Sequence, residues 1–181
     1  MELSLTQSSL FFGLLLLAAG GSLLLKYSSA AAMARNFPRS EQAGKVLMIL
    51  AMAWTGWKVW HLGSMDYGDY KQYILIGFGI LGVLSFKYAA DFLSVRASCI
   101  LYLFFADMLV DSAWMRYEEP LRLLMVVPVY IGIALSLYLA YAPFRLRDFF
   151  GWAFAQESRG KSLAMVAAVY GLLLSGVAFT F

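Results

Sequence analysis

Charged residues are scarce in this chain. Only 14% of its 181 residues are Asp, Glu, Lys or Arg, whereas 62% are hydrophobic and the mean hydropathy is +0.72. Soluble domains usually carry about 25% charged residues. A water-soluble fold of this size could not bury so much apolar surface. The composition therefore excludes an ordinary soluble domain and indicates that lipid is the solvent.

Cysteine and histidine are almost absent. The single cysteine, Cys99, excludes an internal disulfide and a cysteine-rich metal centre. The single histidine, His61, excludes bis-histidine haem ligation and multi-histidine metal sites within the chain. The sequence contains no P-loop, H-E-x-x-H or G-x-S-x-G motif. We therefore favour a non-enzymatic protein. We expect no cofactor, and a bound lipid is compatible with this expectation.

Long apolar runs dominate the sequence. They predict an all-α, polytopic integral membrane bundle in a single domain of residues 1–181. Six runs are candidate spans, at approximately residues 9–25, 46–62, 70–86, 93–114, 123–142 and 162–181.

Basic residues are distributed unevenly between the connections. The odd-numbered connections hold ten Lys and Arg residues, and the even-numbered ones hold four: Lys58, Lys71, Arg116 and Arg122. By the positive-inside rule, the odd connections face the cytoplasm and both termini lie outside. Short loops and this asymmetry suit a bacterial inner membrane. No dense basic run indicates nucleic acid, so the expected partners are the lipid bilayer and either further copies of the chain or other membrane subunits.

The two longest odd connections are expected to be partly helical. The segment 26–45 contains a helix start at Ser40, and the segment 144–161 mixes basic residues with aromatic ones. That mixture is typical of a helix lying in the membrane interface or of an aromatic belt with basic anchors.

Small residues mark where the helices should pack. The sixth run has a stripe of Ala, Gly and Ser that includes Ala164 and Gly171, and the first run offers Gly20 and Gly21. The letters G-x-G-x-x-G at Gly77–Gly82 lie inside an apolar run, so they predict a packing surface and not a dinucleotide site. Pro128 in the fifth run cannot donate a hydrogen bond to the Leu124 carbonyl, which predicts a kink or local opening.

Ionisable residues within the spans are the best indicators of function, because burying one in lipid is costly unless it is paired or hydrated. Asp107 and Asp111 are four residues apart in the fourth run and so share a helix face. Arg96 and Glu118 each lie eleven positions from Asp107, about 20° away in projection. The four residues together predict one polar stripe along an apolar helix.

The second run offers partners for this stripe. Lys58 and His61 share a face with Trp54 and Trp57 and are expected at the same membrane side as Asp111. We predict that Lys58, or else His61, pairs with Asp107 or Asp111. Aromatic side chains surround this outer rim, as an interfacial belt or as a pocket for a lipid or pigment; the tryptophans among them are Trp54, Trp57, Trp60 and Trp114.

Three interpretations of the stripe remain open. It could line a proton or ion path, it could be a structural ion-pair network, or its outer residues could simply lie among lipid headgroups. The sequence thus predicts a small multi-pass membrane protein, with proton- or ion-linked transport as the leading function. The alternatives are a non-catalytic subunit of a larger membrane complex and a lipid- or cofactor-binding protein.

Overall fold

The computed structural model describes residues 4–63 and 66–181, and within these ranges the chain forms eight α-helices and no β-strand. The α-helices are α1 (Leu5–Leu25), α2 (Tyr27–Asn36), α3 (Glu41–Trp60), α4 (Lys71–Tyr88), α5 (Leu93–Ala113), α6 (Leu123–Tyr141), α7 (Phe144–Ala153) and α8 (Glu157–Val177). Short 3-10 turns join them, namely η1 (Phe37–Arg39), η3 (Gly68–Tyr70), η4 (Pro120–Arg122) and η5 (Ala178–Thr180). The predicted helical membrane fold is confirmed.

Four helices in the described chain are long and apolar enough to cross a membrane: α1, α5, α6 with its preceding turn, and α8 with its following turn. The helices α3 and α4 form where spans were predicted, but six spans are not confirmed. Charged residues explain why α3 and α4 are less apolar than the other four long helices, since α3 contains Glu41, Lys45 and Lys58. In α4 only 15 residues lie between Lys71 and Lys87, which is about 22 Å of helix against about 30 Å of hydrocarbon.

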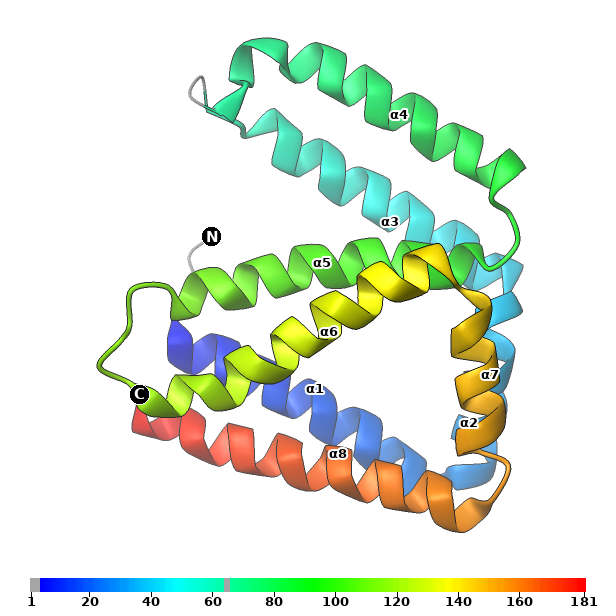
Figure 1. The fold of residues 1–181 in the computed structure, drawn as a ribbon, viewed down its shortest axis with the longest axis vertical. Helices are drawn as coiled ribbons and strands as arrows, with labels where there is room; N and C mark the ends of the chain where they lie inside the picture. The colour runs from blue at the N-terminus through cyan, green and yellow to red at the C-terminus, as the bar shows by residue number, and fades with distance from the viewer. Residues whose placement is uncertain (1–3, 64–65) are drawn as a thin grey trace.

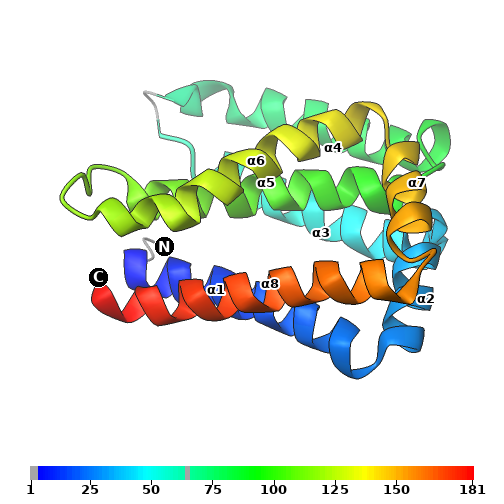
Figure 2. The same ribbon diagram turned by 60° about the horizontal axis from the view of Figure 1, so that its bottom comes forward.

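The long helices run side by side, and the two short ones lie across one end of the bundle. Figures 1 and 2 show α2 and α7 at this end, close together and steeply inclined to the other helices. Both chain termini lie at the opposite end, where the Thr6 hydroxyl donates a hydrogen bond to the Phe181 carbonyl at 3.4 Å. The α3–α4 hairpin forms one edge of the molecule (Figure 1). The two connections that were expected to be partly helical are α2 and α7 with their flanking turns.

The antiparallel pair α1 and α8 is held by the predicted small residues. A Cβ placed on Gly20 would lie 2.5 Å from the Ala164 carbonyl oxygen, and one on Gly171 would lie 2.6 Å from the Gly13 carbonyl oxygen. Such distances mean that the two backbones touch, which is how helices associate in lipid. The packing prediction is confirmed for this pair. In α4 it holds for Gly82, which packs on Met52, whereas nothing lies within 4 Å of a Cβ on Gly77.

The centre of the bundle is closely packed and mostly apolar. Leu109 of α5, Met125 and Val129 of α6, and Leu174 of α8 are each 0% exposed and form one cluster. Cys99 is buried in α5, as a small apolar residue would be. The buried polar side chains at this centre include Ser9 of α1, whose hydroxyl donates a hydrogen bond to the Met125 sulfur at 3.4 Å.

The carbonyl freed by Pro128 has a specific partner. The Tyr170 hydroxyl of α8 donates a hydrogen bond to the Leu124 carbonyl oxygen at 2.5 Å. A backbone acceptor that would otherwise be unsatisfied in hydrocarbon is thereby paired. The hydrogen bond from Tyr170 therefore joins α8 to α6 at this position, whereas the predicted kink stays a prediction.

The two short helices are joined to each other. The Arg35 guanidinium of α2 donates to the Phe154 carbonyl at the C-terminal end of α7. A cation at this position also interacts favourably with the negative end of the helix dipole. The Tyr27 ring lies edge-on to the Phe154 ring at 6.3 Å. These contacts make α2 and α7 one layer across the end of the bundle.

Candidate functional site

An ion pair joins α3 to α5. Lys58 Nζ lies 2.5 Å from Asp107 Oδ2, and the two side chains are 35% and 50% exposed within the isolated chain. One turn earlier on each helix, the Trp54 ring stacks on the Phe104 ring at 5.7 Å. The small residue Gly44 lies against Leu93 near the other end of the contact, where a Cβ would lie 3.1 Å from the Leu93 Cβ. The two helices can therefore stay adjacent along most of their lengths.

A groove lies beside this ion pair at the terminus-bearing end of the bundle. Its volume is about 540 Å³, within the range of ligand pockets. It is lined by Trp54, Trp57, Lys58, His61 and Leu62 from α3 and the residues just after it, and by Met108 and Asp111 from α5. Five of these residues are candidates from the sequence, and the fold brings them into one cavity.

His61 faces the groove without pairing to either aspartate. Its Nδ1 lies 2.8 Å from the Trp57 carbonyl oxygen, and its ring packs on the Trp57 ring with centroids 4.7 Å apart. Because a carbonyl oxygen can only accept, Nδ1 carries the proton of this hydrogen bond. In the neutral ring Nε2 is then an acceptor. His61 can thus accept a hydrogen bond from a ligand.

Asp111 is an exposed carboxylate at the groove, and it forms no ion pair with any basic side chain in the described part of the chain. It is two residues from the end of α5, about 3 Å along the axis, whereas Asp107 is six residues from that end, about 9 Å. Asp107 therefore lies farther from this end of the bundle than Asp111 does. Since Lys58 neutralises Asp107, Asp111 gives the groove a net negative charge when His61 is neutral.

The predicted stripe includes Glu118, and there the prediction is wrong, whereas Arg96 does lie on α5. Arg96 lies at the start of the helix, where its guanidinium donates to the Ala89 and Asp91 carbonyls at 3.1 and 3.2 Å. Glu118 is not on the helix, because α5 ends at Ala113 and Met115 takes a left-handed conformation with φ of 62°. Helical projection past Ala113 has no meaning, and the polar site is restricted to the last two turns.

Two tryptophans of the predicted rim lie outside the groove. The Trp60 ring lies under the ammonium group of Lys71 at 5.2 Å, so it faces the start of α4. Trp114 follows the last residue of α5, is 67% exposed and borders a separate hollow near Tyr117. The aromatic walls of the groove are therefore Trp54 and Trp57.

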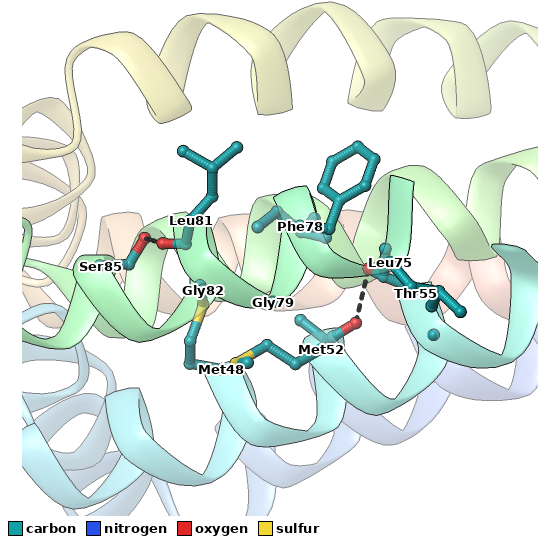
Figure 3. Close-up of a pocket in the computed structure, with 12 residues that line it drawn as sticks. Met48, Met52, Thr55, Leu75, Phe78, Gly79, Leu81, Gly82 and Ser85 are labelled. Carbon is teal, nitrogen blue, oxygen red and sulfur yellow. Dashed lines mark hydrogen bonds between the residues drawn. The ribbon is translucent and has the colours of Figure 1, made fainter. Parts of the chain in front are cut away.

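A second cavity, of about 290 Å³, lies between α3 and α4 (Figure 3). Met48, Met52, Leu75, Phe78 and Gly82 are among its lining residues. Two hydroxyls also line it, but each donates to a carbonyl of its own helix at 2.8 Å: Thr55 to Ala51 and Ser85 to Leu81. The cleft therefore offers hydrocarbon contacts and no free donor.

Apolar residues of the groove were missed by reasoning from the sequence. Phe104 and Met108 lie one turn before Asp107 and Asp111 on α5 and contact or line the site. Their spacing of three residues from the aspartates was a usable signal, because residues three or four apart share a helix face. Leu62 had no such signal, since it follows the end of α3.

The sequence matches no protein-family model and no curated protein, and the fold matches no solved structure.

Proposed function

We propose that this multi-pass membrane protein binds the cationic head of an amphipathic molecule in the groove between α3 and α5. The observation that carries the proposal is the composition of that groove: a free carboxylate at Asp111 in a groove that Trp54 and Trp57 also line. Aromatic faces attract organic cations, and a carboxylate in a partly desolvated site favours them further. Leu62 and Met108 supply contacts for an apolar body. The groove opens at the surface of the bundle, where a ligand dissolved in the membrane can reach it.

The groove favours a cation over an anion. Its one lysine is neutralised by Asp107, and His61 offers an acceptor. At the same end of the bundle, the described residues include four basic and six acidic side chains, so the wider field is also negative. An anionic head would meet Asp111 with no free cation to balance it.

Two hydrophobic ions of nearly equal size provide the test. We expect the full chain in mild detergent to bind tetraphenylphosphonium more tightly than tetraphenylborate, as measured by isothermal titration calorimetry. Asp111→Asn should weaken tetraphenylphosphonium binding about tenfold, because the attraction between the carboxylate and the phosphonium charge is lost, and should leave tetraphenylborate binding no weaker.

The matched control is Asp69→Asn, which removes an exposed carboxylate at the same end outside the groove. It should bind both ions as the unaltered chain does. Equal affinity of the unaltered chain for the two ions, or an unchanged preference in Asp111→Asn, would refute the proposal.

Transport of such a cation is the second candidate function. The position of Asp107, farther from the end of α5 than Asp111, favours it. A ligand cation that displaced Lys58 from Asp107 would move inward by about one helical turn, or ~5 Å. The arrangement gives less support to a path through the whole bundle, since the charged side chains of the site stop at Asp107 and the centre is closely packed. Uptake into proteoliposomes of tetramethylammonium, an organic cation too polar to cross lipid by itself, would establish transport in addition to binding if Asp107→Asn abolishes it.

A role as a subunit or homo-oligomer is supported by a single element. The helix α4 has one buried residue in the structure, Gly82, and presents an apolar surface that includes Ile76, Ile80 and Val83. Lipid would cover this surface as well as a partner would. We therefore place ligand binding before assembly.

A further inference from the structure

A polar hollow at the opposite end of the bundle, next to the α2–α7 layer, is independent of the groove. It has a volume of about 530 Å³ and lies between η1, the start of α3 and the connection from α4 to α5. The residues that line it include Arg39, Glu41, Lys45, Phe86, Asp91 and Phe92.

Two guanidinium groups meet at one ring of this hollow. The Arg39 guanidinium carbon lies 5.9 Å from the centroid of the Phe92 ring, and that of Arg147 lies 6.0 Å from the same centroid. The two arginines come from different elements, η1 and α7, and Phe92 itself has a left-handed backbone with φ of 57°. An anion bound beside this ring would be attracted by both positive charges.

The charges near the ring are equal in number, three basic and three acidic, but two of the six form no ion pair in the described part of the chain. Arg147 is paired with Asp148 at 2.7 Å, and Lys45 is paired with Glu41 at 3.3 Å. Arg39 is exposed, and in the described ranges no carboxylate pairs with it. Asp91, which is also exposed, lines the hollow and opposes an anion. The free cation that lines the hollow is thus Arg39, and Arg147 lies near the same ring without lining the hollow.

The surroundings of the hollow suit a lipid headgroup. Ten of the fourteen basic residues and only four acidic ones lie at this end of the bundle, and Figure 2 shows α7 lying across it. The α7 helix carries Phe149, Phe150 and Trp152 together with its arginines, a combination typical of the membrane interface. Basic pockets between helices at such a surface bind anionic phospholipid headgroups.

We infer that this hollow binds the phosphate of an anionic phospholipid, held by the guanidinium groups of Arg39 and Arg147, with the glycerol and first acyl carbons against Phe86 and Phe92. Planar guanidinium groups bind phosphate oxygens in a bidentate manner, so arginine suits this role better than lysine.

Native mass spectrometry of the full chain with equal amounts of phosphatidylglycerol and phosphatidylcholine tests the inference. We expect retained phosphatidylglycerol to exceed phosphatidylcholine. Arg39→Gln should lower the affinity for phosphatidylglycerol about fivefold, since one basic residue near an anionic lipid contributes about that factor. Arg39→Gln combined with Arg147→Gln should remove the preference. Asp91→Asn should change the affinity in the opposite direction, because it removes the opposing carboxylate.

Arg116→Gln is the matched control, since Arg116 lies in the loop after α5 at the other end; it should leave the preference unchanged. An excess of inorganic phosphate should not displace the lipid, and full displacement would mean that the ligand is a soluble phosphate compound and overturn the lipid assignment. No preference in the unaltered chain, or a preference that survives in the double variant, would also overturn it. If the double variant loses its helical circular dichroism, the increase expected in Asp91→Asn decides the matter, and its absence counts against the inference.

Discussion

The Lys58–Asp107 pair has a different meaning in lipid from the one it would have in water. An exposed ion pair in water contributes about 0–1 kcal/mol. Within a membrane, the relevant alternative is an unpaired charge, which costs several kcal/mol. Because these side chains are 35% and 50% exposed in the isolated chain, their surroundings are set by whatever fills the groove, either lipid, water or ligand.

A double-mutant cycle on Lys58→Ala and Asp107→Ala measures this pair. Each single variant should be less stable than the unaltered chain, because it leaves the other charge unpaired, and the double variant should recover part of the loss. We expect a coupling energy of about 1 kcal/mol in thermal unfolding followed by circular dichroism in mild detergent. Lys71→Ala combined with Asp107→Ala is the control, since Lys71 lies over Trp60. Additive losses in the Lys58 cycle would show that the pair contributes nothing.

The charged residues of the site were largely predictable from the sequence. How far the site extends along α5 was not. Charges in apolar runs identified Lys58, Asp107 and Asp111, because such residues are expensive in lipid. The end of α5 at Ala113 was not recognised, so Glu118 was wrongly placed on its face. The convergence of Arg39 and Arg147 on Phe92 had no sequence signal, because it depends on how η1 and α7 meet at the end of the bundle.

At the scale of elements, the association of α1 with α8 depends on glycines that are not equivalent. A Cβ on Gly20 would lie 2.5 Å from the Ala164 carbonyl oxygen and 2.7 Å from the Ala168 amide nitrogen, whereas one on Gly21 would meet nothing within 4 Å. The sequence predicted small residues as packing surfaces in both helices. It did not distinguish the two adjacent glycines or state that the first and last spans pair, because the pairing is a contact between distant parts of the chain.

Gly20→Ala and Gly21→Ala therefore form a matched pair. Gly20→Ala should destabilise the protein by about 1–3 kcal/mol, since the added methyl group forces the two backbones apart. Gly21→Ala should be neutral or stabilising by up to about 1 kcal/mol, because alanine favours the helix more than glycine does. The midpoints of thermal unfolding in the same detergent would show the difference. Equal effects would contradict the close packing of α1 and α8 at Gly20.

At the scale of the whole molecule, the length of α3 and α4 bears on how many helices cross the membrane. The helix α3 has 20 residues, about 30 Å, and it follows α5 from Gly44 to Lys58. If α5 crosses the bilayer, α3 beside it extends through nearly the same depth. Lysines at the two ends of α4 can extend toward the headgroups and compensate for its short apolar stretch. The fold thus leads us to expect that both helices cross, although their composition alone falls short.

Single cysteines in a Cys99→Ser background test this expectation together with the predicted orientation. Asp69→Cys lies between α3 and α4, Thr180→Cys marks the terminus-bearing end, and Ser158→Cys marks the α2–α7 end; all three positions are exposed. With six crossings and external termini, a membrane-impermeant maleimide should label Asp69→Cys and Thr180→Cys in intact cells. Ser158→Cys should react only after permeabilisation, as the excess of basic residues around it predicts. If Asp69→Cys, like Ser158→Cys, reacts only after permeabilisation, only four helices cross. Labelling of Thr180→Cys only from inside would reverse the orientation. The reversal would also place the groove on the cytoplasmic side, since α5 ends at the same end of the bundle as the chain does.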